Sequence, residues 1–82
     1  MKYIMYPSGS FVVWNENNIA HRDMNDAMMA LGNSDPSSAG FVRENKDGSF
    51  ECYGKSTTLG IESEERDNNT ISVFFKRRQR DV

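Results

Sequence analysis

The chain has 82 residues, of which 37% are hydrophobic and 27% are charged, and its formal net charge is -2 at pH 7. This length supports one hydrophobic core and excludes an enzyme with separate cofactor and substrate lobes, so we expect a single domain over residues 1–82. The net charge excludes a molecule-wide field that would attract nucleic acid or an anionic membrane. A core this small predicts marginal stability or stabilisation by self-association, so a homodimer is one expected assembly.

Two apolar runs near the N-terminus predict a first β-hairpin, because turn-forming residues separate them. The runs cover residues 3–6 and 11–14, with Pro7-Ser8-Gly9-Ser10 between them. The second run, Phe11-Val12-Val13-Trp14, is apolar on both faces. This pattern indicates a strand that is covered on both sides, or one whose outer face meets a partner.

The next segment has the spacing of an amphipathic helix. Counted from Ala20, its apolar residues fall at offsets 0, 4, 7, 8 and 11, and they are Ala20, Met24, Ala27, Met28 and Leu31. Gly32 follows at a position where a helix commonly ends. Met29 lies about 140° from Met24 around this helix, so we expect it to project toward solvent or a partner. Met29 and Trp14 are therefore candidate partner-binding residues, since Met and Trp are enriched at interfaces. The alternative is that a small domain fills an irregular core with flexible Met side chains.

A second hairpin is predicted from residues 39–43 and 49–53, because the Asp47-Gly48 step between them favours a tight turn. Residues 57–61 resemble a further short strand. The last apolar segment, residues 71–75, fits the spacing of either a strand or a helix. Capping favours the helix, because Asp67 can cap its start and basic residues lie at its end. We predict a C-terminal helix over residues 68–79, and an α+β fold in which a small antiparallel sheet of two hairpins carries both helices on one face.

The stretch Gly54-Lys55-Ser56-Thr57 raises the question of a phosphate-binding loop, which ends in Gly-Lys-Ser/Thr. Such a loop needs a first glycine with four residues before the Gly-Lys pair, and a helix after it. Here five residues separate Gly48 from Gly54, they alternate like a strand, and β-branched threonines follow the lysine. We therefore expect a hairpin or strand-end turn with an exposed Lys55, and no nucleotide or other cofactor.

Other side chains with possible chemistry have simpler interpretations. His21 is the only histidine and Cys52 the only cysteine, so a metal site lacks its usual ligands and no intramolecular disulfide can form. A Cys–His nucleophilic pair would require the two residues to meet in space, and a buried strand cysteine is the commoner outcome. The carboxylates of Glu62, Glu64 and Glu65 are typical of a solvated turn. We expect no catalytic and no metal-binding residues.

The basic C-terminal end, residues 76–82, supports an alternative function in nucleic-acid binding. Its cations could contact phosphates, and they are Lys76, Arg77, Arg78 and Arg80. Acidic residues just upstream balance them, so any such field is local. No apolar run approaches the length of a membrane span, and Met1 is not followed by the apolar core of a signal peptide, so we expect a cytoplasmic protein.

Most of the chain resembles small uncharacterised accessory proteins of bacteriophages and prophages. The segments that carry the resemblance are Phe11-Val12-Val13-Trp14, Ile19-Ala20-His21-Arg22-Asp23-Met24, Ser38-Ala39-Gly40-Phe41-Val42, Cys52-Tyr53-Gly54-Lys55-Ser56 and Leu59-Gly60-Ile61-Glu62-Ser63. The resemblance implies a non-enzymatic protein in the cytoplasm of a bacterial host. It also implies that the protein acts by binding a host or defence protein, with no catalytic residues to assign.

Overall fold

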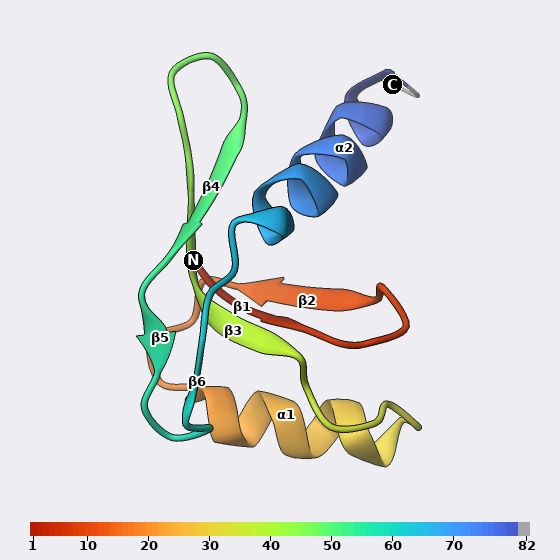
Figure 1. The fold of residues 1–82 in the computed structure, drawn as a ribbon, viewed down its shortest axis with the longest axis vertical. Coiled ribbons are helices and arrows are strands. Elements are labelled where there is room, and N and C mark those ends of the chain that lie inside the picture. Colours follow the sequence, from red (N-terminus) through yellow and green to blue (C-terminus); the bar gives the residue numbers. More distant parts are fainter. Residues whose placement is uncertain (81–82) are drawn as a thin grey trace.

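The computed structural model describes residues 1–80, with side chains up to residue 76, and its centre is an antiparallel sheet (Figure 1). The four strands are β1 (Lys2–Met5), β2 (Phe11–Trp14), β3 (Ser38–Glu44) and β4 (Phe50–Tyr53). Their order in the sheet is β2-β1-β3-β4, and every pair is antiparallel. The α+β class and the antiparallel sheet predicted from the sequence are therefore confirmed.

Both predicted hairpins form, and a glycine closes each turn. In the β3–β4 hairpin the Asn45 N–H donates to the Ser49 carbonyl at 2.7 Å, and Gly48 has φ +87°. The β1–β2 hairpin repeats this geometry, with Gly9 at φ +92°. Glycine adopts this left-handed conformation without the steric cost of a Cβ, so the turn residues set the register of both hairpins.

The two helices cover opposite faces of the sheet, which corrects the expectation that both lie on one face (Figure 1). Alternate residues of β1 point to opposite sides, and each side has its own hydrophobic cluster. Tyr3 and Met5 pack with Ile71 of α2 (Arg66–Arg80), whereas Ile4 and Tyr6 belong to the cluster that contains Met24 and Met28 of α1 (His21–Ala30). Phe11 and Val13 of β2 pack against the first cluster and Val12 and Trp14 belong with the second, so β2 is covered on both faces, as one of the two sequence interpretations expected.

The buried face of α1 differs from the predicted one. The residues buried on this helix are His21 and Asn25, Met24 and Met28 are half-buried, and Leu31 is 80% exposed. Asn25 accepts a hydrogen bond from the Tyr6 hydroxyl at 2.9 Å, and His21 bonds to the backbone of β3. These polar contacts turn the helix so that part of its apolar stripe faces away from the sheet.

The stretch expected to form a strand over residues 57–61 is a turn for most of its length. Lys55–Ser56 (β5) pairs with Ile61–Glu62 (β6), and residues 57–60 connect them. The Ser56 hydroxyl accepts a hydrogen bond from the Leu59 N–H at 3.2 Å, which holds the turn closed. Threonine is compatible with a strand, but the turn-forming contacts of Ser56 and the positive φ of Gly60 decide the local structure.

The predicted C-terminal helix is confirmed as α2. Asp67 lies in its first turn, and its carboxylate accepts a hydrogen bond from the N–H of Glu64 at 3.3 Å, three residues earlier. This is the backward half of a capping box, and it satisfies an N–H group that the helix leaves unpaired. Between residues 1 and 80 no helix is both long and apolar enough to cross a membrane.

Candidate functional site

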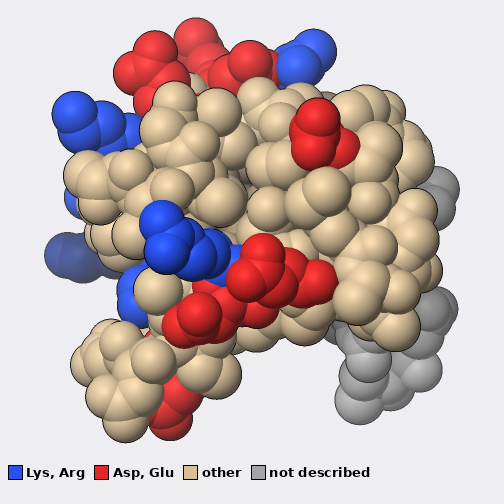
Figure 2. Space-filling view, turned by 90° about the horizontal axis from the view of Figure 1, so that it is seen from below, with Lys and Arg blue, Asp and Glu red and all other residues tan. Residues whose placement is uncertain are grey.

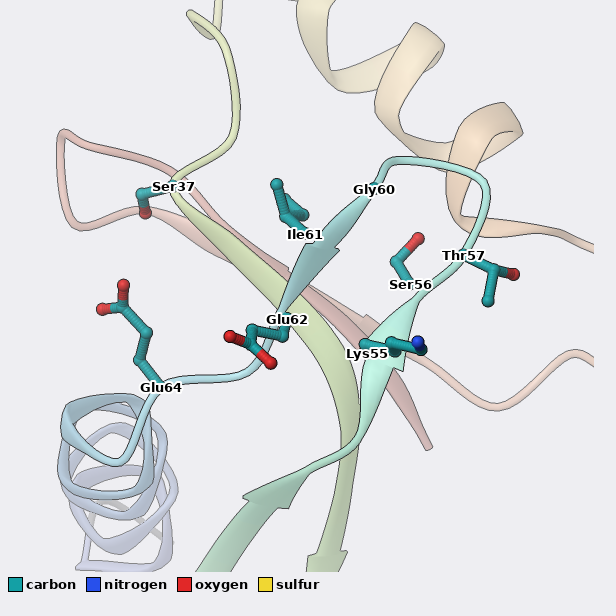
Figure 3. Close-up of a pocket in the computed structure, with 8 residues that line it drawn as sticks. All are labelled: Ser37, Lys55, Ser56, Thr57, Gly60, Ile61, Glu62 and Glu64. Carbon is teal, nitrogen blue, oxygen red and sulfur yellow. The ribbon is translucent and has the colours of Figure 1, made fainter.

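A pocket of about 530 Å³ lies between the β5–β6 hairpin, the start of β3 and the start of α2 (Figure 3). Its polar lining comes from the Gly-Lys-Ser-Thr stretch and from two glutamates. The lining residues are Ser37, Lys55, Ser56, Thr57, Gly60, Ile61, Glu62 and Glu64. The hairpin and the helix start thus place side chains of both charge signs around one opening.

The charges of this pocket are only partly paired. Lys55 is opposite Glu62 in the β5–β6 register, and Arg66 forms an ion pair with Glu64. In Figure 3 the Glu62 carboxylate reaches toward the side on which Glu64 lies. The lining contains hydroxyl, ammonium and carboxylate groups but neither His nor Cys, so a Ser–His arrangement is not among the described residues of this pocket.

The Gly-Lys-Ser-Thr stretch has the geometry of a strand and a turn. Lys55 is exposed, as predicted, while Ser56 is buried and bonded within the turn. A phosphate-binding loop instead passes directly into a helix whose first N–H groups face the phosphates. Here the next element is β6, so the stretch cannot present a helix N-terminus to a nucleotide.

A second polar cluster is buried beneath α2 and centres on Asp67, which is 2% exposed. Its carboxylate accepts hydrogen bonds from the hydroxyls of Tyr3 and Ser38, each at 2.6 Å. Burial, and then the hydrogen bond and charge of Asp67, raise the pKa of Tyr3 well above its ordinary value. The cluster joins β1, β3 and α2. The capping pattern identified Asp67, but nothing in the sequence identified Tyr3 and Ser38 as its partners.

Cys52 and His21 do not form a nucleophilic pair. Cys52 packs against the cluster beneath α2, whereas the His21 ring contacts Trp14 on the opposite face of the sheet, with ring centroids 5.3 Å apart. Burial, and to a smaller extent the charge of Asp67, raise the pKa of the Cys52 thiol to about 11. The thiol therefore stays protonated at neutral pH, and the thiolate that a nucleophilic mechanism needs is scarce.

His21 anchors the start of α1 to the sheet. Its Nε2–H donates to the carbonyl of Gly40 at 2.8 Å, and its ring also contacts Phe41 edge to face at 5.7 Å between centroids. Burial is the main cause that lowers the pKa of this imidazole, so the neutral form predominates at pH 7. Among residues 1–76, no group of three or more His, Cys, Asp or Glu side chains could hold a metal ion.

The structure separates the two predicted partner-binding residues. Trp14 is only 9% exposed, and its indole N–H donates to the carbonyl of Ile19 at 3.0 Å, so it belongs to the core beside the start of α1. Met29 is 40% exposed near the end of α1, where Leu31 is also exposed. Trp14 therefore offers little surface to a partner, and the exposed apolar residues of α1 gather at the other end of the helix.

The candidate nucleic-acid residues fall mostly outside the described side chains. Lys76 is exposed on α2, and the helical backbone continues to Arg80. The side chains of Arg77, Arg78 and Arg80 lie outside the described residues.

Comparison of the chain with protein-family models, with curated protein sequences and with solved structures gives no match.

Proposed function

We propose that this protein is a non-enzymatic binding module that acts by binding another protein through the apolar end of α1. This surface consists of Ala27, Met29 and Leu31, all of which are exposed. The resemblance to phage and prophage accessory proteins suggests the partner, which is a host or defence protein of a bacterium.

The observation that carries the proposal is the exposure of two large apolar side chains within three residues. Leu31 is 80% exposed and Met29 is 40% exposed, although the core of so small a protein has few apolar residues to spare. Figure 2 views the molecule from the side that carries α1, and its charged groups leave a broad uncharged area between them. Large apolar side chains that are exposed close together, as Met29 and Leu31 are, are typical of protein-binding sites.

The non-enzymatic part of the proposal draws on the state of the candidate nucleophile. The Cys52 thiol has a raised pKa, and the sheet separates it from His21. The serine hydroxyls of the pocket have no histidine beside them. These arrangements favour a role in binding over covalent catalysis.

An affinity pull-down from a bacterial lysate tests the proposal, with the full chain as bait and two charge-introducing variants. We expect Leu31→Glu and Met29→Glu to lose the captured protein, because a partner that encloses the end of α1 contacts both flanks of the helix. Val73→Glu is the matched control, since Val73 is 44% exposed on α2, on the opposite side of the sheet. Capture that survives both α1 variants, with the fold intact by circular dichroism, would contradict the proposal.

The nucleic-acid alternative predicts a different result. Deletion of residues 76–82 should leave protein capture intact if the end of α1 is the binding site. On the alternative, the same deletion should weaken oligonucleotide binding and flatten its dependence on salt, because fewer counterions are then released. A mobility shift assay at several salt concentrations distinguishes the two.

A further inference from the structure

The two edge strands of the main sheet, β4 and β2, differ in whether their outward backbone groups form hydrogen bonds. At the β4 edge, the N–H and C=O groups that point away from β3 belong to Phe50 and Cys52. The Ser72 hydroxyl bonds to both groups of Phe50, at 2.9 and 3.3 Å, and Asn68 accepts the Cys52 N–H at 2.7 Å. Side chains of α2 therefore close this edge against a further strand.

At the β2 edge, the side chains of residues 1–76 provide no comparable cover. The register pairs Ile4 with Val12, and the Tyr6 N–H donates to the Ser10 carbonyl at 2.9 Å, so alternate residues from Ser10 face β1. The N–H and C=O groups of Phe11 and Val13 consequently point outward. No described residue forms a hydrogen bond with them. This edge is a template on which another strand can be hydrogen-bonded.

The strand β2 is only four residues long, but its sequence lacks two of the features that usually protect an edge. Phe11–Trp14 contains no charge and no proline, and its aromatic and β-branched residues favour strand pairing. Beside it, the ring of Phe74 contacts the Phe11 ring at 5.3 Å between centroids, and Phe74 is 42% exposed. Apolar surface thus continues from the β2 edge onto α2.

We propose that β2 pairs with β2 of a second copy of this chain, antiparallel and about a two-fold axis at Val12. In this register Phe11 of each copy exchanges two hydrogen bonds with Val13 of the other, which uses all the outward groups of both residues. Ser10 is then opposite Trp14, and no charged residue faces another across the axis. Two four-stranded sheets become one continuous sheet. Both copies of α1 then lie on one face of it, and both copies of α2 lie on the other. The Ser10 hydroxyl donates to the side chain of Asn33 at 3.0 Å, so the residues that follow α1 lie beside this edge. The dimer is argued from the β2 edge alone and does not rest on the proposed function.

Multi-angle light scattering after size-exclusion chromatography tests this dimer with the full chain, from micromolar to millimolar protein. We expect a mass of twice 9.4 kDa at high concentration and a return to 9.4 kDa on dilution. Val13→Pro removes an outward N–H while leaving the bonds to β1 intact, and should weaken dimerisation about tenfold or more. Val13→Thr is the matched control, because it keeps the N–H and the branched side chain, and it should still dimerise.

Amide hydrogen exchange of the unmodified chain provides a second readout that does not depend on the folding of a variant. The amides of Phe11 and Val13 should become protected as the concentration rises. The Cys52 amide, which already bonds to Asn68, should be equally protected at every concentration. A monomer at all concentrations would overturn the proposal, and so would a dimer in which the amides of Phe11 and Val13 exchange rapidly.

Discussion

At the scale of single residues, Gly40 illustrates how closely β3 approaches the end of β4. A Cβ at this position would lie 2.6 Å from the backbone carbonyl oxygen of Tyr53 and 3.2 Å from that of Gly54. Both atoms belong to the backbone, so neither can move without displacing the end of β4 or the residue that follows it. We expect Gly40→Ala to lower the free energy of unfolding by about 2 kcal/mol, measured by urea denaturation. An unchanged unfolding midpoint would show that the approach is looser than described.

His21 makes stability depend on pH. Burial lowers its pKa in the folded state below its ordinary value of 6.5, so the unfolded chain binds the proton more readily. The free energy of unfolding should therefore fall as the pH drops below about 6.5. His21→Gln cannot titrate, and this variant should show a flatter dependence between about pH 5 and pH 7.5. Parallel curves for the two proteins would mean that another group causes the effect.

At the scale of elements, α1 shows that an apolar pattern can locate a helix without identifying which of its residues are buried. The apolar spacing correctly located the helix, but it assigned Leu31 to the core because it did not consider polar residues that bond to buried groups. Met28→Asp should lower the free energy of unfolding by about 2 kcal/mol or more, because Met28 packs in the cluster with Tyr6 and Trp14. Leu31→Asp should change the free energy of unfolding by less than about 0.5 kcal/mol. Thermal unfolding compares the pair, and equal losses would restore the face predicted from the sequence.

A buried carboxylate, that of Asp67, links the start of α2 to β1 and β3. Asp67→Asn keeps the size of the side chain but removes the charge that accepts the hydroxyls of Tyr3 and Ser38. We expect it to destabilise the protein by about 2 kcal/mol, since hydrogen bonds to a charged acceptor are stronger than neutral ones. Tyr3→Phe removes only one donor and should cost less. If Asp67→Asn proved the milder of the two, the carboxylate would not be the centre of this cluster.

At the scale of the whole molecule, local signals in the sequence predicted the two hairpins and the two helices, but neither the β5–β6 pair nor the arrangement of the elements. The Asp47-Gly48 step and the cap at Asp67 act within a few residues, so the second hairpin and α2 could be predicted. The side of the sheet that each helix covers depends on contacts between residues far apart in the chain, such as Asp67 with Tyr3. For the same reason, the pocket that joins Ser37 to Lys55 and Glu64 left no local pattern.

The central claim is that the end of α1 is the protein-binding surface, and amide hydrogen exchange with and without the captured partner tests it most directly. We predict added protection over residues 27–33, with little change in the segment of α2 that carries Val73. The affinity for the partner should fall sharply in Leu31→Glu and remain the same in Val73→Glu. Protection confined to residues 76–82, with the end of α1 unaffected, would contradict the account and favour the basic end of the chain as the binding site.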